Sequence, residues 1–398
     1  MNNQSTKKIS ILLLLGPMVT LGAFAMDLYA PFIPFLQQEF NASAFAIQAT
    51  VNIFMLVIGC CQIFLGPLSD KYGRKSILMF SSLIYAIGSL FCYLTTEIEY
   101  FILARALQAL GACGAVVTSY AAIRDCYEGE SAQRYFSFLV GITGCAPIVA
   151  PLLGTGLANY FGNWKVIFIF LALYSLTGFL MLSFFLKEKV QVQPHKKLLP
   201  SCTEINNIIF HSHFKQWFLT PAVVMSGLFL FFATSSHYIQ SHLGHSQWEF
   251  SIFFSINAIL YAGSSFLAPM VLGRLGAYRT IRVGLLMIIF SSLSLIIQSY
   301  LGPNNLIWFL SGAYTCCVAY GLIQGAGMGM VLQPFSENVG LVSALVGTVQ
   351  FTIASLLGVF TVHPPVQSAW PFAFPMLVLS ILAYINAYMI RQEQSCVA

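Results

Sequence analysis

Long apolar segments follow one another along almost the whole chain, separated by short breaks that are charged or rich in glycine, proline and asparagine. A helix that spans a membrane needs about 20 consecutive, mainly apolar residues. Segments of this kind predict twelve spanning helices, at approximately 9–35, 45–67, 76–95, 99–122, 134–160, 165–186, 217–238, 249–272, 280–300, 305–332, 340–362 and 370–390. Membrane barrels are built from much shorter alternating strands. The pattern therefore predicts an all-α integral membrane protein.

The composition agrees with this class. Of the 398 residues, 58% are hydrophobic and only 8% are charged, whereas soluble domains average about 25% charged residues. Such a chain has too little polar surface to fold as a soluble enzyme or a secreted domain. The cysteines include the adjacent pairs Cys60–Cys61 and Cys316–Cys317 inside apolar runs, and none has the spacing of a metal site. We expect buried apolar cysteines, with no metal and no cofactor.

The 18 Lys and Arg residues are distributed unequally between the two ends of the predicted helices. All except Lys165 and Arg105 fall on the same side as the N-terminus, and basic residues favour cytoplasmic loops. We therefore expect both termini in the cytoplasm. Residues 7–25 imitate a signal peptide, but the apolar run continues to Leu36, so we expect the first helix to be retained. The net charge of +5 then reflects loop placement, and we expect no nucleic-acid partner.

The longest stretch between predicted helices divides the chain into two sets of six spans. We expect an N-terminal six-helix bundle at 1–186, a cytoplasmic central loop at 187–215 and a C-terminal six-helix bundle at 216–398. Within the loop, Ser201 and Glu204 have the spacing of a capping box. This spacing predicts a short helix on the cytoplasmic membrane surface, with an unstructured tether as the alternative.

Only two acidic or basic side chains, Asp27 and Arg105, fall well away from the ends of the predicted spans, where such a group costs about 2.5 to 3.5 kcal/mol on insertion scales. Both lie roughly 9 to 12 Å inside the outer boundary at 1.5 Å per residue, so they can pair if their helices touch. Removal from water favours the neutral form of Asp27, and a nearby Arg105 favours the charged form. We expect Asp27 to carry protons beside the fixed charge of Arg105. The alternatives are a structural ion pair, a hydrated Asp27, or an Arg105 that binds backbone carbonyl groups.

The loop between the second and third predicted helices reads Gly66-Pro-Leu-Ser-Asp70-Lys-Tyr-Gly73-Arg74-Lys75. Gly66 and Gly73 permit a tight turn. Asp70 can meet the positive end of a helix, and Arg74 can pair with an acid such as Asp125. A loop that only kept basic residues on the cytoplasmic side would need neither these glycines nor Asp70. We therefore expect this loop to take part in conformational gating.

Three segments resemble motifs of one transporter family. The loop resembles the signature of the major facilitator superfamily, G-x-L-[SA]-D-R-x-G-R-[RK], with Lys71 in place of the first arginine. The run 105–111 is similar to the family's R-x-x-Q-G-x-G, with Gln108 retained and Ala109 replacing a glycine. Residues 27–34 resemble D-x-Y-x-P-x-x-P of drug exporters in the bicyclomycin-resistance (Bcr/CflA) group.

The fifth predicted helix supplies a fourth resemblance. Residues 144–154 are similar to the antiporter motif A-P-x-x-A-P-x-x-G-G, with Pro147, Pro151 and Gly154 present and Thr155 in place of the final glycine. Prolines bend a helix and small residues permit close helix approach. We expect this segment to move during transport, with a static kink as the alternative.

The resemblance implies twelve helices in two pseudo-symmetric six-helix bundles, which rock about a central cavity in a bacterial inner membrane. It implies a multidrug efflux antiporter driven by the proton gradient, with Asp27 and Arg105 as the proton-coupling pair. It also implies that Asp70 stabilises the outward-open state by facing a terminus of the eleventh helix. We expect a monomer in the lipid bilayer.

Polar side chains within the spans are the candidates for a substrate cavity. They are Asp27, Tyr29, Asn52, Gln108, Asn257, Tyr261, Gln324 and Gln350. Hydrogen bonding between helices is the commoner use of such groups. A permanently cationic substrate would compete with the proton for one acid, so we expect neutral or zwitterionic amphiphiles.

Other functions are compatible with the same spans. A dedicated exporter of a metabolite such as a siderophore, or a proton-symport nutrient importer, would need no different architecture. A lipid-modifying membrane enzyme would need a catalytic cluster near one membrane face, and the loops offer only ordinary charges. A passive channel would need a ring of selectivity groups. We therefore expect a transporter and no enzyme.

Overall fold

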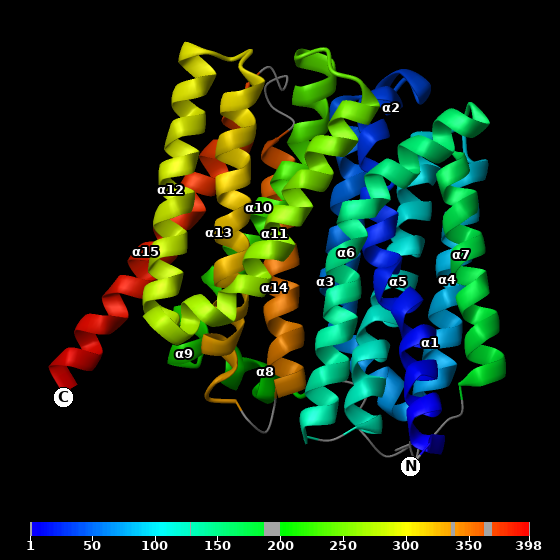
Figure 1. The fold of residues 1–398 in the computed structure, drawn as a ribbon, viewed down its shortest axis with the longest axis horizontal. Coiled ribbons are helices and arrows are strands. Elements are labelled where there is room, and N and C mark those ends of the chain that lie inside the picture. The colour runs from blue at the N-terminus through cyan, green and yellow to red at the C-terminus, as the bar shows by residue number, and fades with distance from the viewer. Residues whose placement is uncertain (1, 128, 187–199, 336–338, 362–367, 398) are drawn as a thin grey trace. The chain divides into compact units, whose positions relative to one another are not determined.

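The computed structural model describes residues 2–127, 129–186, 200–335, 339–361 and 368–397. Every regular element in these ranges is a helix. Twelve helical segments among the described residues are long and apolar enough to cross a membrane, so the predicted class and the predicted number of spans are confirmed. The chain divides into unit 1, Met1–Leu199, and unit 2, Pro200–Ala398 (Figure 1).

Unit 1 contains the first six spans. They are built from α1 (Asn2–Asp27), η1 (Ala30–Phe32), α2 (Ile33–Glu39), α3 (Ala44–Tyr72), α4 (Arg74–Leu94), α5 (Ile98–Cys126), α6 (Gly129–Phe161) and α7 (Val166–Phe185). Helix α5 packs on α3 and α4, α4 packs on α7, and α1 lies against α5, α6 and α7. A Cβ at Gly111 would lie 2.5 Å from the Tyr85 nitrogen. Glycine thus lets the backbones of α4 and α5 touch.

Unit 2 contains the other six spans. They are built from α9 (Ser212–Trp217), α10 (Leu219–Ser236), the π-helix η2 (His237–His242), α11 (Gln247–Leu275), α12 (Ala277–Leu301), α13 (Leu306–Leu332), α14 (Val339–Phe360) and α15 (Trp370–Val397), and the short helix α8 (Cys202–Ile209) precedes them. Helix α13 packs on α10, α11 and α12, and α10 also packs on α14 and α15.

The second span is longer than its sequence pattern predicts. Helix α3 continues through Pro67 to Tyr72, because a proline removes only one hydrogen bond of the ladder and a long apolar helix can absorb the bend. Gly66 therefore lies within a helix. Gly73 alone makes the turn to α4, with φ of 91°. Gly276, with φ of 76°, makes the corresponding turn from α11 to α12 in unit 2.

The segment predicted as the central loop is partly helical. Ser201 N donates to Glu204 Oε2 at 2.9 Å and completes a capping box at the start of α8. Ile208 is buried and Ile209 is exposed. An unstructured tether is therefore wrong for 202–209, while the remainder of the predicted loop at 187–199 lies outside the described residues.

Candidate proton and conformational site

The first span is broken beside Asp27, where one continuous helix was expected. Helix α1 ends at Asp27, and the chain continues through η1 into the short helix α2. Pro31 has no N–H to donate to the Asp27 carbonyl four residues earlier. The turn tightens as a result, and Tyr29 N donates to Met26 O at 3.2 Å. The Ala25 carbonyl consequently loses the donor that it would have in a continuing helix.

Arg105 of α5 supplies the missing donor. Its Nη1 donates to Ala25 O at 2.9 Å, and its Nη2 lies 3.1 Å from Met26 Sδ. The same Nη1 donates to Gln108 Oε1 at 2.6 Å. In turn, Gln108 Nε2 donates to Ser89 Oγ at 2.8 Å. A buried guanidinium on α5 thus fixes the C-terminal end of α1 and is itself fixed by α4.

The environment of Arg105 stabilises a positive charge although the side chain is fully buried. The guanidinium carbon lies 4.8 Å from the ring centre of Tyr29 and 4.5 Å from that of Phe54. Aromatic faces attract cations, and the C-terminal end of a helix carries partial negative charge. These groups replace the carboxylate that usually accompanies a buried arginine.

Asp27 and Arg105 lie at the same break but do not form an ion pair. The Asp27 carboxylate accepts no hydrogen bond and makes no ion pair among the described residues, and the side chain is 7% exposed. Of the alternatives weighed from the sequence, Arg105 bound to a backbone carbonyl is the one seen here. The break therefore brings a fixed cation to the last turn of α1, where Asp27 is an acid without a partner among the described residues.

Two candidates for the substrate cavity belong to this buried network. Tyr29 and Gln108 are both fully buried. Tyr29 Oη lies 2.7 Å from Thr50 Oγ1, and Thr50 Oγ1 donates to Ile47 O at 2.6 Å. In this structure both side chains bind protein groups instead of facing an open cavity.

The antiporter-like segment of α6 touches the same break. A Cβ at Gly154 would lie 2.5 Å from Leu28 O, so only glycine fits against the residue that follows Asp27. Pro151 and Pro147 lie within the same helix, one and two turns earlier. The resemblance alone did not reveal this contact. The sequence feature that could have indicated a close helix contact is a glycine that follows two prolines at helical spacing.

Four of the gating candidates, Asp70, Gly73, Arg74 and Asp125, form a second, separate cluster where α3 meets α4. Arg74 is 7% exposed and begins α4 directly after the Gly73 turn. Its Nε donates to Asp125 Oδ2 at 2.7 Å, the pairing considered from the sequence. The guanidinium also forms an ion pair with Asp70 and donates to the Ser69 hydroxyl. This cluster ties the ends of α3, α4 and α5 together.

The other cavity candidates lie on several helices. Asn52 Oδ1 accepts a hydrogen bond from Gln48 Nε2 at 3.1 Å within α3. In unit 2, Asn257 and Tyr261 lie on α11, Gln324 on α13 and Gln350 on α14. The side-chain oxygens of Asn257, Gln324 and Gln350 are buried and accept no hydrogen bond from the described residues. Unit 2 thus offers buried acceptors without any charge.

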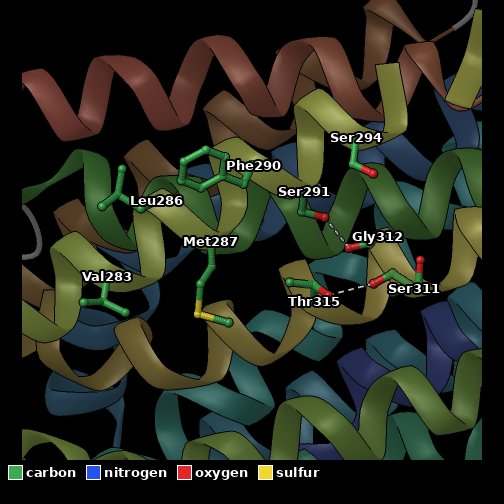
Figure 2. Close-up of a pocket in the computed structure, with 9 residues that line it drawn as sticks. All are labelled: Val283, Leu286, Met287, Phe290, Ser291, Ser294, Ser311, Gly312 and Thr315. Carbon is green, nitrogen blue, oxygen red and sulfur yellow. Dashed lines mark hydrogen bonds between the residues drawn. The ribbon is translucent and has the colours of Figure 1, made fainter. Parts of the chain in front are cut away.

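A groove of about 530 Å³ opens on the surface between α12 and α13 of unit 2. Its walls are formed by Val283, Leu286, Met287, Phe290, Ser291, Ser294, Ser311, Gly312 and Thr315. Figure 2 shows its hydroxyl groups turned to protein partners: Ser291 donates to Gly312 O at 2.6 Å and Thr315 to Ser311 O at 2.8 Å. A groove whose hydroxyls are already bonded has little with which to select a polar substrate.

Fold and site together define a polytopic membrane protein with a charge buried inside its first six-helix unit. The family described as Major Facilitator Superfamily matches residues 15–359, and the chain belongs to that superfamily. It is therefore a membrane transporter and not an enzyme, and the resemblance seen in the sequence is confirmed.

Several relatives match nearly the whole chain, and two of them are named for drug resistance. One is the chloramphenicol resistance protein of Pseudomonas aeruginosa, 28% identical over 97% of this chain and 93% of that protein. The other is a bicyclomycin resistance protein homolog of Haemophilus influenzae, 25% identical over 96% of this chain and 97% of that protein.

A solved structure shares the fold. It is a bacterial homolog of the human lysosomal transporter Spinster in an inward-facing, occupied conformation, with a TM-score of 0.77 and 16% identity over 97% of both chains. At this identity the likeness establishes the fold alone.

Proposed function

We propose that this chain exports small amphiphilic molecules across a bacterial inner membrane in exchange for protons, by alternating access. Membership of the superfamily makes it a transporter. Relatives named for resistance to chloramphenicol and bicyclomycin support a drug-like substrate and outward transport. The acid at the break of the first span supports proton coupling.

The observation that carries the proposal is the placement of Asp27. It is the one acid more than five residues from either end of a span among the described helices. Its carboxylate has no protein partner in the described part of the chain, yet the residue retains 7% exposure. A structural acid at this depth would be paired, because an isolated buried charge is costly. An acid that is free of partners and still reachable by water can bind and release a proton.

The residues around the break have different roles in the proposed transport cycle. Arg105 stays charged and holds the end of α1 in place. Gly154 presses α6 against Leu28, so a movement of α6 reaches the residue next to Asp27 directly. Alternating access would then change which side supplies water to the carboxylate, and with it where the proton enters and leaves.

One proton is sufficient for useful export. A unit charge that crosses a potential of 100 mV yields about 2.3 kcal/mol, which sustains roughly a 40-fold gradient of a neutral substrate. Neutral or zwitterionic amphiphiles fit this scheme, because a fixed cation would compete with the proton at Asp27. The uncharged acceptors of Asn257, Gln324 and Gln350 suit the same class.

The orientation and assembly follow from the distribution of charge. We place both termini in the cytoplasm, since all Lys and Arg residues except Lys165 and Arg105 lie on that side. Asp27 and Arg105 come from one unit of one chain, so we propose a monomer as the working form. The proton gradient is its energy source, with no cofactor.

The test is gradient-driven efflux from proteoliposomes preloaded with radiolabelled chloramphenicol. An inward proton gradient should accelerate efflux by the native protein. Asp27→Asn should lower this acceleration at least tenfold while the protein still inserts and folds. Glu99→Gln is the matched control: it removes an exposed acid in the first turn of α5 and should leave efflux unchanged.

The alternatives give different outcomes. A symporter would be accelerated by an outward proton gradient. A dedicated metabolite exporter would couple to protons but leave chloramphenicol inside, and a substrate screen would then identify its cargo. Full gradient-driven efflux by Asp27→Asn would contradict the role of Asp27.

A further inference from the structure

We propose that Lys165 is a positioning residue that clamps α2 onto the rest of unit 1 and closes the route from the outer surface to Asp27. The outer end of unit 1 means here the end that carries Glu39 and Lys165. In Figure 1, α2 lies at the upper end of unit 1, opposite the N-terminus. The proposal rests on the proton-carrying role of Asp27 and adds to it the device that controls access from one side.

The turn between α6 and α7 is built to present Lys165. Gly162 adopts φ of 68°, which turns the chain sharply after α6. Asn163 Oδ1 then accepts a hydrogen bond from Lys165 N at 2.9 Å, a local bond typical of asparagine in turns. Because α7 begins at Val166, Trp164 and Lys165 occupy fixed positions at the end of the unit.

The Lys165 ammonium joins segments that are distant in sequence. Its Nζ lies 3.3 Å from Glu39 Oε1 at the end of α2 and donates to Thr95 O, just past α4, at 3.3 Å. It also lies 5.3 Å from the ring centre of Phe40 and 5.9 Å from that of Trp164. The Lys165 side chain is only 13% exposed, against 45% for Glu39. A basic residue on the outer side opposes the usual charge bias, and these contacts give a specific reason for its presence.

Helix α2 needs such a clamp. It has seven residues, fewer than an isolated helix requires for stability, and the break at Asp27 separates it from α1. Its far end is closed by Asn41, with φ of 45°, and by a hydrogen bond from Ala42 N to Gln37 O at 3.1 Å. These are the features of a Schellman motif, and they place Glu39 and Phe40 beside Lys165.

An aromatic cluster fills the space between Lys165 and the break. It consists of Tyr29, Phe32, Phe40, Phe101, Trp164 and Phe168, whose neighbouring ring centres lie 5.2 to 6.4 Å apart. The cluster is continuous from the rings under Lys165 to Tyr29, which lies against the Arg105 guanidinium. Closely packed rings leave little room for water. With the clamp closed, the cluster therefore hinders water from passing between Lys165 and Tyr29, which lies two residues after Asp27.

Hydrogen–deuterium exchange of the full-length protein in lipid nanodiscs tests the clamp directly. Lys165→Gln should make amides of the segment 28–40 exchange roughly 3- to 10-fold faster, from loss of one ion pair and two cation–π contacts. Lys165→Arg should restore protection. Lys75→Gln is the matched control at the other end of the unit, where Lys75 Nζ donates to Ser183 O at 2.8 Å, and it should leave 28–40 unchanged.

A proton-leak measurement tests the consequence for Asp27. In proteoliposomes with a trapped pH dye and no substrate, Lys165→Gln should admit protons several-fold faster than the native protein. Adding Asp27→Asn to Lys165→Gln should remove this increase in proton leak. If Lys165 were merely structural, the leak would not depend on Asp27 and the double variant would leak as fast as Lys165→Gln. If Lys165→Gln does not fold, Glu39→Gln gives a second variant with a smaller effect, because Glu39 is the more exposed partner.

The failing outcomes are distinct. Unchanged exchange of 28–40 in Lys165→Gln overturns the clamp, as does faster exchange throughout unit 1. Faster exchange of 28–40 without a leak overturns the closing of the route. Full gradient-driven efflux by Asp27→Asn overturns the proposed function instead, and the exchange data still decide whether Lys165 positions α2.

Discussion

The two six-helix units use the same helical plan but differ in the charges inside their spans. In each unit one glycine in the left-handed region, Gly73 or Gly276, turns the second helix directly into the third. Unit 1 buries Arg105 and carries Asp27 at a helix break. In unit 2 the sequence from 283 to 336 contains no Asp, Glu, Lys or Arg at all. All of α13, and α12 from Val283 onward, therefore pack without charge, and the buried Nε of Arg282 lies near the start of α12. The charges farther inside the spans of unit 1 call for another explanation.

Gln298 of unit 2 shows how an uncharged side chain can tie helices together. Gln298 is fully buried, and its Nε2 donates to Tyr238 Oη and to Gly302 O, each at 2.9 Å. An uncharged amide thus ties η2 to the turn after α12. Arg105 makes similar ties in unit 1 but adds a permanent charge to them. The proposed proton coupling would give that charge a use that the uncharged amide cannot serve.

Replacement of Arg105 should have the largest effect. Arg105→Met leaves Ala25 O and Gln108 Oε1 without their donor, and two orphaned buried acceptors cost about 2 to 4 kcal/mol. Thermal unfolding in detergent should show this loss, and proteoliposome efflux should lose its dependence on the proton gradient. Gln298→Met is the counterpart in unit 2. It should lower stability by about 1 to 2 kcal/mol and leave the gradient dependence intact. An equal loss of gradient dependence in both variants would refute the functional asymmetry.

A substitution at the contact between α6 and the break should have the second-largest effect on stability and efflux. Gly154→Ala forces a methyl group to within 2.5 Å of Leu28 O, and overpacking of this kind costs about 1 to 3 kcal/mol. Efflux should slow together with the fall in melting temperature. At Gly263 of α11 an added methyl group would meet no atom within 4 Å, so Gly263→Ala should stabilise by up to about 1 kcal/mol through helix propensity. Wild-type efflux by Gly154→Ala would show that the contact is dispensable.

The fold follows from the sequence far more completely than the site does. The spans could be predicted because a run of about twenty apolar residues is stable chiefly as a helix across a membrane. The break beside Asp27 also had a signal, since Pro31 removes the donor for the Asp27 carbonyl. The partner of Arg105 had no signal in the sequence. The Ala25 carbonyl is free because Tyr29 N donates to Met26 O instead, and this hydrogen bond depends on the three-dimensional packing.

Long-range contacts were the least predictable part of the site. Gly154 and Leu28 are far apart in sequence, and only the packing of α6 on α1 brings them together. The contacts of Lys165 were hidden for the same reason. Its position at the boundary between two predicted helices was evident, but its partners Glu39 and Thr95 come from two other segments. Arg74 and Asp125 could be paired in advance, because each lies at a helix end on the same side of unit 1.

The smallest effect should come from the turns that the two units share. Arg74→Ala removes the ion pairs with Asp70 and Asp125 at the start of α4. Both acids keep some exposure, so the expected cost is about 1 kcal/mol, with efflux slowed severalfold and the apparent affinity for chloramphenicol unchanged. Arg274, near the corresponding turn of unit 2, is exposed and makes no ion pair among the described residues. Arg274→Ala should therefore change neither the rate nor the melting temperature. If both variants slow efflux equally, the ion pairs of Arg74 with Asp70 and Asp125 have no special role. Arg74 and Arg274 would then act only as basic residues at a helix end, and the two turns would be functionally alike.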